Sequence, residues 1–244
     1  MNRFSKFAAS ALALSLVPAM LMGCGKKEAS TGSDLDYIKQ KGTLVVGITD
    51  FAPMDYRDDN GEWTGFDAEL ARLVASQLGL ECEFIEIDWD NKILELESKS
   101  IDCVWNGMTL TDEVLNAMEC TAPYLVNAQV VVMKSDKVAD YADVDAMKDL
   151  AVAVESGSAG DETAANNGFT NVTKVTAQAD ALMEVASGTA DACIIDLTMA
   201  KAMTGDGTSY ADLSIAAEMD RPRDRRRCAF RYPSKLSPSS PSRR

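Results

Sequence analysis

Polar residues suited to holding a small molecule follow a short apolar run near the middle of the chain. The run 101–105 predicts a buried strand, and Asn106 and Gly107 come directly after it. Thr109 and Thr111 then precede an acidic helix start, where unpaired backbone N–H groups favour the anionic or polar end of a ligand. Gly107 would let the backbone approach that ligand closely. An ordinary turn in which Thr111 only caps the helix is the alternative.

A second segment repeats this pattern further along the chain. Residues 98–106 parallel residues 187–195, and Asp196 follows the second apolar run as Asn106 and Gly107 follow the first. We interpret the two segments as the same strand-to-helix corner, built once in each of two lobes, with chance similarity as the alternative. Ligands of open α/β sheets bind beyond the carboxyl ends of the strands, so the two corners predict a ligand cleft between the lobes.

The elements that must position these corners alternate between apolar runs and amphipathic ones. We expect strands at 43–48, 83–87, 101–105, 129–133, 150–154, 172–175 and 192–195. The clearest helix is 67–78, which Gly79 ends, and 90–96 and 177–186 also have helical spacing. Strand–helix alternation of this kind predicts an α/β fold with parallel sheets covered by helices on both faces.

Composition excludes several kinds of chemistry. The chain has no histidine, which removes Ser-His-Asp and Cys-His catalysis and the common zinc sites. No Asp-x-Asp-x-Asp-Gly loop is present, so we expect no metal and no cofactor. The formal net charge of −14 argues against a nucleic-acid partner. Cys82, Cys103 and Cys193 lie in strand-like runs and are expected as buried free thiols, whereas Cys120 is expected to be half-exposed.

The first 24 residues have the features of an export signal. Arg3 and Lys6 form a basic start, and the apolar run 7–22 leads to Gly23 and Cys24. The Leu-Met-Gly-Cys ending resembles the bacterial lipobox, so we expect lipidation of Cys24 and anchoring to the outer face of the bacterial cytoplasmic membrane, or a periplasmic location. Residues 25–34 are small and polar, as in a flexible tether. A plain cleavable signal or a short membrane anchor is the alternative.

The last segment, 221–244, breaks every pattern of the body. It holds most of the chain's arginines together with many serines and prolines, and the change begins abruptly after Asp220. A basic tail that binds nucleic acid is one interpretation. We favour an aberrant tail, either the product of a frameshift or assembly error or disordered, because an acidic exported domain has no obvious use for such a segment.

Several blocks, taken in order, resemble the family 3 extracellular solute-binding proteins, the amino-acid receptors of ABC importers. The blocks include Lys41-Gly-Thr-Leu-Val-Val-Gly47, Gly65-Phe-Asp-Ala-Glu-Leu70, Gly107-Met-Thr-Leu-Thr-Asp-Glu113 and the segment 190–196. The resemblance implies a two-lobed periplasmic-binding-protein-like fold with two hinge strands and a ligand cleft. It places the first lobe at 35–126, the second at 127–208 and a return hinge into the first lobe at 209–220.

The resemblance also implies roles for particular residues in the cleft. Trp89 and Phe51 match aromatic positions that line it, and Asp50 matches a contact to the ligand side chain. Gly107 and Thr109 match contacts to the ligand carboxylate, to which the corner itself adds Asn106 and Thr111. Ser156 and Ser158 match contacts from the second lobe, and Asp196 matches the acid that receives the α-ammonium group.

Two positions depart from the family pattern. Val114 stands where the family usually has an arginine that clamps the α-carboxylate, and Glu155 stands where a base often precedes the Ser-Gly-Ser segment. The loss of one charge-assisted hydrogen bond weakens binding by about tenfold to a hundredfold unless another group replaces it. The acids at the site favour a cationic or weakly anionic solute. Lys92 is a candidate for the missing positive charge.

The sequence therefore predicts a monomeric, lipid-anchored receptor that closes around an amino acid or similar small polar solute and delivers it to a membrane permease. No covalent chemistry is needed. An enzyme on the same scaffold, such as a dehydratase, is the first alternative, with carboxylates such as Asp50 and Glu155 as acid or base. A sensory or adhesive surface receptor is the second.

Overall fold

The computed structural model describes residues 33–219, 225–226 and 229–230. The predicted signal with Cys24, most of the tether and most of the basic tail lie outside the described residues. No helix within the described ranges is long and apolar enough to cross a bilayer. Three or more potential metal-ligating side chains do not gather anywhere in this part of the chain.

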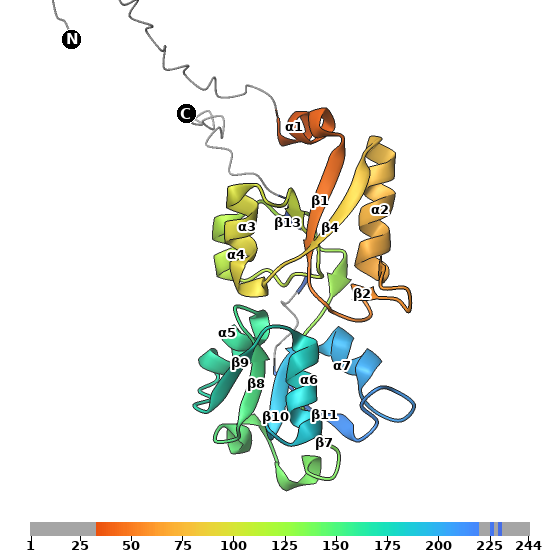
Figure 1. The fold of residues 1–244 in the computed structure, drawn as a ribbon. Helices are drawn as coiled ribbons and strands as arrows, with labels where there is room; N and C mark the ends of the chain where they lie inside the picture. The colour runs from red at the N-terminus through yellow and green to blue at the C-terminus, as the bar shows by residue number, and fades with distance from the viewer. Residues whose placement is uncertain (1–32, 220–224, 227–228, 231–244) are drawn as a thin grey trace, which may run out of the picture. The chain divides into compact units, whose positions relative to one another are not determined.

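The first lobe is built on a four-stranded sheet in the order β13-β5-β1-β4 (Figure 1). The central strand β1 runs parallel to β4 and β5, and β13 is antiparallel to β5. A short hairpin, β2 with β3, follows β1. The strands are β1 (Thr43–Ile48), β2 (Tyr56–Arg57), β3 (Trp63–Thr64), β4 (Glu81–Glu86), β5 (Cys103–Val104) and β13 (Ala229–Phe230). The helices are α1 (Asp34–Lys41), α2 (Phe66–Leu78), the 3-10 turn η1 (Trp89–Asn91), α3 (Lys92–Ser98) and α4 (Asp112–Ala117).

Strand β1 is buried on both faces because helices cover both sides of its sheet. Leu44, Val46 and Ile48 point to one side, where they pack in one cluster with Ala71 of α2. Val45 points to the other side, into a second cluster that includes residues of α3 and α4. This near-continuous apolar run is typical of a strand in a parallel sheet, and it explains why the sequence predicted β1 at its observed bounds.

The second lobe is built on a five-stranded sheet in the order β11-β7-β10-β8-β9. Strand β7 is antiparallel to both β10 and β11, whereas β10, β8 and β9 are parallel to one another. The strands are β7 (Gln129–Lys134), β8 (Val152–Glu155), β9 (Val172–Val175), β10 (Ala192–Asp196) and β11 (Leu213–Glu218). The helices are η2 (Val138–Asp140), η3 (Val144–Met147), α5 (Ala159–Asn166), α6 (Gln178–Ser187) and α7 (Leu197–Met203).

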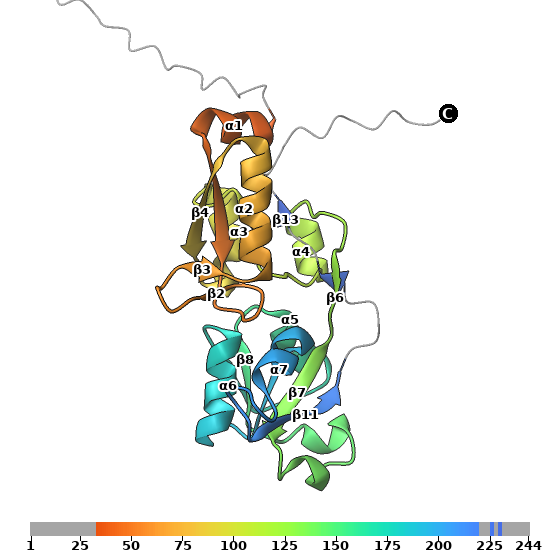
Figure 2. The same cartoon turned by 90° about the vertical axis from the view of Figure 1, so that its right-hand side faces the viewer.

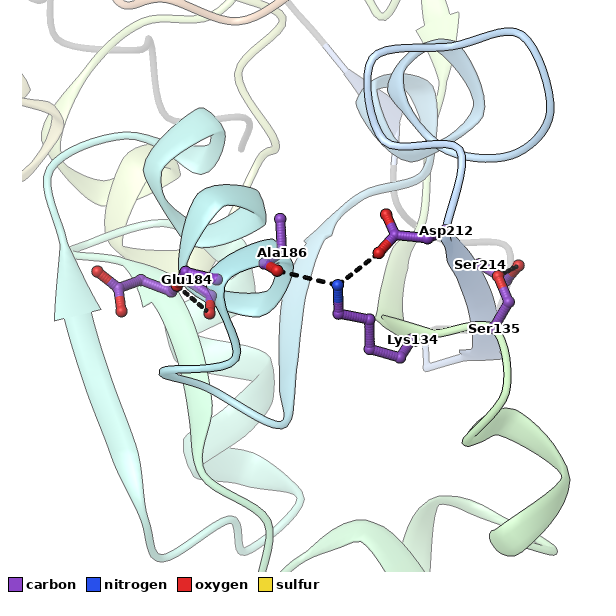
Figure 3. Close-up of polar contacts among 7 residues, drawn as sticks. Lys134, Ser135, Glu184, Ala186, Asp212 and Ser214 are labelled. Atoms are coloured by element: carbon purple, nitrogen blue, oxygen red, sulfur yellow. Dashed lines mark hydrogen bonds and ion pairs between the residues drawn. The ribbon is translucent and has the colours of Figure 1, made fainter.

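The core of the second lobe again forms two clusters, one on each face of the sheet. Val130 and Val132 of β7 face α6 and α7, whereas Val131 and Met133 face the side covered by α5. At the end of β7, the Lys134 ammonium donates to the Ala186 carbonyl at 2.9 Å and pairs with the Asp212 carboxylate at 2.5 Å (Figure 3). These bonds tie the end of β7 to the last turn of α6 and to the segment before β11.

The helix-to-strand connections before β5 and β10 are built alike, as the sequence repeat predicts. In each, two hydroxyl groups two residues apart pair with each other, Ser98 with Ser100 at 2.9 Å and Ser187 with Thr189 at 3.0 Å. In each, an aspartate carboxylate accepts from a backbone N–H of the neighbouring segment: Asp102 from Val45 at 2.7 Å and Asp191 from Ala151 at 2.9 Å. The helix-to-strand connection is therefore a true structural repeat. The corners beyond the strands differ, because α7 begins directly after β10 whereas the segment 105–111 lies between β5 and α4.

The predicted elements are present, with shifts at their ends. Strand β9 has the predicted bounds, and α2 and α6 match to within one residue at each end. Strand β5 is shorter than predicted, because the Ile101 N–H bonds to the Glu95 carbonyl and leaves the ladder. The helix expected at 90–96 divides into η1 and α3. Cys103 and Cys193 are buried free thiols, whereas Cys82 and Cys120 are half-buried; burial raises the pKa of Cys82 to about 11.

The expected return hinge at 209–220 is wrong over most of its length. Residues 213–218 form β11, which pairs with β7 inside the second sheet with a bulge between Ile215 and Ala217. The chain returns later: β12 (Arg225–Arg226) pairs with β6 (Leu125–Val126), and β13 then joins the first sheet (Figure 2). Two short pieces of the basic tail thus have backbone partners, which the interpretation of the tail as aberrant did not anticipate.

Candidate functional site

The predicted corners of both lobes line one pocket. It holds about 380 Å³ of empty space, part of it open to solvent. The first lobe contributes Trp89, Lys92, Asn106, Gly107, Met108, Thr109, Thr111 and Val114, and the second contributes Glu155, Gly157, Ser158, Ala159, Gln178 and Asp196. The pocket therefore lies at the carboxyl ends of strands from two sheets, where open α/β folds bind ligands.

On the first lobe, the corner after β5 is fixed by Asn106. Its side-chain oxygen accepts from the Thr49 N–H at 2.9 Å, and its amide donates to the Thr49 hydroxyl at 2.7 Å. Gly107 then takes a φ of 58°, which favours glycine. Thr111 caps α4, because its hydroxyl oxygen accepts from the Val114 N–H at 3.3 Å.

Helix α4 has only six residues, so its dipole contributes little to holding an anion. From the sequence, a ligand carboxylate was expected to bind Thr109, Thr111 and the N–H groups of the helix. The Thr111 N–H is already engaged, since it donates to the Thr109 carbonyl at 3.1 Å. A ligand carboxylate at this corner would therefore have one backbone donor fewer, and a positive group nearby would strengthen its binding.

On the second lobe, the corner after β8 is shaped by Gly157 and Ser158. Gly157 has a φ of 65°, and a Cβ there would lie 2.5 Å from the side-chain oxygen of Asp90 in the first lobe. Ser158 caps α5 by accepting from the Asp161 N–H at 3.1 Å. Glu155, the last residue of β8, is buried in the pocket wall.

Asp196 ends β10 and is surrounded by amide side chains. Its carboxylate accepts from Gln129 at 2.8 Å, from Gln178 at 2.7 Å and from Asn127. The Asn127 oxygen in turn accepts from the backbone and the hydroxyl of Thr198. The acid is only 6% exposed, so it has lost most of its hydrogen bonds to water. The amide donors replace those bonds.

Lys92 brings a positive charge into the pocket. Its ammonium donates to the Trp89 carbonyl at 3.2 Å and to the Gly157 carbonyl at 2.9 Å, and it lies 5.2 Å from the centre of the Trp89 ring. Burial lowers the pKa of Lys92, while nearby acids, with Glu113 first, act in the opposite direction. Among the described residues that line the pocket, Lys92 is the one cation.

Seven of the ten predicted ligand-binding residues line this pocket: Trp89, Asn106, Gly107, Thr109, Thr111, Ser158 and Asp196. Phe51 does not, because its ring is buried in the hydrophobic cluster of the second lobe, together with Met54. Ser156 is half-buried and its N–H donates to the Val175 carbonyl at 2.9 Å. Asp50 is exposed beyond the end of β1.

Asp50 lies in an acidic neighbourhood of its own. Partial burial, Glu86 and Asp180 all raise the pKa of its carboxyl group, and Arg57 opposes them. Asp180 belongs to α6 of the second lobe, and it also receives the Ala177 N–H at 3.1 Å. Negative charge from both lobes therefore gathers at this point, outside the pocket that seven of the predicted residues line.

Sequence reasoning missed the amide residues that hold Asp196. Gln129 opens the apolar run of β7 and is 1% exposed, and a polar residue at the start of a buried strand was the available signal. Gln178 begins α6, where its side chain also accepts from the Asp196 N–H at 2.9 Å. Neither spacing nor periodicity links these residues to Asp196, because the contacts depend on how the sheet is assembled.

Comparisons with known proteins agree with this architecture. Residues 44–201 match the family model of bacterial extracellular solute-binding proteins, family 3. The L-cystine-binding protein TcyJ of Escherichia coli (strain K12) is 30% identical over 141 residues, which cover 57% of this chain and 53% of that protein. The chain thus spans about half the length of this curated relative.

Solved structures give the same result over more of the chain. The holo form of ArgBP from T. maritima has a TM-score of 0.73 and 31% identity, covering 80% of this chain and 85% of that one. The ancestral amino acid-binding protein AncCDT-1, a precursor of cyclohexadienyl dehydratase, has a TM-score of 0.73 and 30% identity, covering 82% and 86%. The two-lobed α/β fold is thereby confirmed, and the chain belongs to the bacterial extracellular solute-binding proteins of family 3.

Proposed function

We propose that this protein is the solute receptor of an ABC importer and that it binds an amino acid in the pocket lined by both lobes. The observation that supports it best is the pocket itself, where Asp196 of one lobe shares a cavity with the Asn106–Thr111 corner of the other. A zwitterion with an ammonium group at one end and a carboxylate at the other fits such a pair of walls. The family and its relatives agree with this function.

In this proposal the α-ammonium group of the solute binds the Asp196 carboxylate. The carboxylate of the solute lies at the Gly107–Thr111 corner, Trp89 packs on its apolar part, and Ser158 contacts it from the second lobe. Asp50 and Ser156 are left for the far end of a longer solute. Phe51 takes no part, because its ring fills the core of the second lobe.

The charge of the pocket favours neutral or cationic amino acids. Among the described residues that line it, Glu155 and Asp196 contribute two carboxylates and Lys92 contributes one ammonium group. An acidic side chain on the solute would add a third anion in a partly desolvated space, where like charges repel most strongly. ArgBP, whose structure matches this one, was solved bound to arginine in a related form, and TcyJ is named for L-cystine.

The activity is binding and release without covalent chemistry. A solute that contacts both lobes stabilises their closed arrangement by the difference between its affinities for the closed and open states. The closed form would then be recognised by a permease in the membrane. We further propose export through the N-terminal signal and anchoring through a lipid on Cys24, which keeps the receptor beside that permease.

A calorimetric titration of the purified protein with the 20 common amino acids, L-ornithine and L-cystine tests this function. We expect micromolar or tighter binding of at least one neutral or cationic amino acid, and no binding of L-glutamate or L-aspartate. Trp89→Leu should weaken that binding by at least tenfold, about 1.4 kcal/mol, while the circular dichroism spectrum stays unchanged.

Two results would contradict the proposal. If no amino acid binds the folded wild-type protein, the pocket has another use. If a bound amino acid is converted to product on incubation, as judged by mass spectrometry, the protein is an enzyme on this scaffold. The second result matters because AncCDT-1 is described as a precursor of a dehydratase.

A further inference from the structure

Lys92 is an unusual residue for a pocket wall, because it is a lysine with only 3% of its surface exposed. It begins α3, directly after the 3-10 turn that carries Trp89. Burial of an ammonium group is costly unless hydrogen bonds and an opposite charge compensate for it. A lysine in such a place therefore calls for a partner.

The partners that the structure gives Lys92 are two neutral carbonyl oxygens. One belongs to Trp89 of the same lobe, at 3.2 Å, and the other to Gly157 of the second lobe, at 2.9 Å. A lysine ammonium carries three N–H donors. These two bonds leave one N–H to meet a further acceptor in the pocket that Lys92 lines.

Four acids surround Lys92 without forming an ion pair with it in the described part of the chain. Glu113, Glu155, Asp90 and Asp161 all favour its charged form, yet the salt bridges within 4.0 Å involve other lysines and arginines. The Asp161 carboxylate, for example, pairs with Lys174 at 2.7 Å. The ammonium thus lies in a negative field while its close contacts remain uncharged.

Val114 gives the second, independent observation. Its side chain is 2% exposed and packs in the apolar cluster of Trp89, Met108 and Met118, so this position supplies no charge to the pocket. The short helix α4 supplies little either. The β5–α4 corner therefore depends on a charge from elsewhere in the pocket if it is to hold a carboxylate.

We propose that Lys92 is the specificity-determining cation of this receptor and binds the α-carboxylate of the solute. This inference rests on the proposed function. The solute carboxylate accepts the third N–H of Lys92 while the same ammonium stays bonded to Gly157. Because Gly157 belongs to the second lobe, the carboxylate and the junction of the two lobes share one cation. A lysine offers a single point charge rather than the two-pronged contact of an arginine.

Amino acids and their α-carboxamides test this assignment, because the amide keeps the size and the ammonium group but removes the negative charge. L-Arginine and L-argininamide are the first probes; otherwise the amino acid that binds most tightly and its carboxamide are used. Dissociation constants are measured by calorimetry for the wild type, Lys92→Met, Lys92→Arg and Lys39→Met. Lys39 is the matched control, an exposed lysine of α1 in the same lobe.

We expect the wild type and Lys39→Met to bind the acid at least tenfold more tightly than the amide. Lys92→Met should bind both about equally, mainly through loss of affinity for the acid, and Lys92→Arg should keep part of the preference. Methionine matches the length of lysine and suits an apolar cluster, so the variant should fold, which a thermal melt checks. A lysine with a purely structural role would weaken acid and amide alike.

An unchanged ratio of acid to amide in folded Lys92→Met overturns this assignment and leaves the receptor function intact. Failure of the wild type to bind any amino acid overturns the receptor function and this assignment with it. The two failures are thus distinguished by the wild-type titration alone.

Discussion

The connections that lead into β5 and β10 share one design, but the corners that follow the two strands differ in length and in chemistry. Both are entered through the same paired hydroxyls and the same aspartate-to-backbone bond. Beyond β5, the first lobe has Asn106, whose side-chain amide accepts from the Thr49 N–H and donates to the Thr49 hydroxyl. The second lobe places Asp196, a carboxylate held by three amides. The repeated connection thus leads into a strand that ends at the pocket in each lobe, and the residue that lines the pocket there decides whether the corner carries charge.

This difference gives the pocket a polarity. A neutral amide that bonds within its own lobe stabilises the corner and leaves it free of charge. At the second corner, the Asp196 carboxylate accepts hydrogen bonds from three amides and presents a negative group to the pocket. The two corners together can therefore distinguish the two ends of a zwitterion, which two identical corners could not.

The largest effect is expected from removing the charge at the second corner. Asp196→Asn should weaken amino-acid binding by tenfold to a hundredfold, since a charge-assisted hydrogen bond contributes about 1.5–3 kcal/mol. Calorimetry with the best solute measures the change. Asp191→Asn is the matched control, because it alters an aspartate of the same lobe whose carboxylate accepts from the Ala151 N–H and does not line the pocket. Equal affinities in wild type and Asp196→Asn would show that the acid does not contact the solute.

Removing the neutral amide at the first corner should damage the fold rather than the binding. Asn106→Leu leaves the Thr49 N–H without its side-chain acceptor inside the lobe and should lower the free energy of unfolding by about 1–3 kcal/mol. Urea denaturation followed by circular dichroism measures it. Thr49→Val removes only the hydroxyl and should cost less. A larger loss in Thr49→Val than in Asn106→Leu would contradict this account.

The repeat also shows how far the sequence could predict the molecule. Local patterns were enough for β1, β9, α2 and α6, because burial on both faces or on one stripe leaves a clear period in the residue types. The corner residues were found because they follow strands directly. The place of β11 could not be predicted, since the same apolar residues suit a hinge or an edge strand and only its pairing with β7 decides.

Contacts between distant segments account for the other differences. Phe51 was expected to line the cleft, yet it packs with Met54 in the hydrophobic cluster of the second lobe. The amides of Asn127 and Gln129 reach Asp196 only because β7 and β10 are paired in antiparallel register. The sequence indicates Lys92 only as a candidate replacement for the arginine that is missing at Val114. Its hydrogen bond to Gly157 joins distant segments and depends on the three-dimensional structure.

A smaller effect is expected at the position where the two connections have the same left-handed backbone conformation but different residues. The helix before β10 ends at Gly188, with a φ of 80°, whereas the helix before β5 ends at Lys99, with a φ of 66°. A Cβ at Gly188 would meet no atom within 4 Å, so only the backbone conformation resists a side chain there. Gly188→Lys should therefore lower the free energy of unfolding by about 1 kcal/mol.

The reciprocal change tests whether the two positions are equivalent. Lys99→Gly should relieve the left-handed conformation and stabilise the protein by less than about 1 kcal/mol, because it also removes the contact of the ammonium with the Tyr37 ring at 5.0 Å. Thermal and urea unfolding of both variants measure the pair. Opposite signs are expected, and a gain in both variants would show that the connections are not equivalent.

The smallest effect on stability is expected at Asp50, a predicted site residue of the first lobe that follows β1. Partial burial raises the pKa of Asp50 most, and the like charges of Glu86 and Asp180 raise it further. The folded protein then binds this proton more tightly than the unfolded chain, so the group costs stability as pH rises from its unfolded pKa through the raised one. Asp50→Asn should accordingly raise the melting temperature slightly at pH 7 and leave it unchanged near pH 3.

Thermal melts across this range, with Glu86→Gln as a second variant that removes one of the repelling charges, distinguish this from a structural effect of the amide. A gain in melting temperature that is the same at both pH values would mean that the ionised Asp50 carboxylate is not its cause. The structural contrast between an acid near like charges, Asp50, and an acid held by amide donors, Asp196, would then have no counterpart in stability.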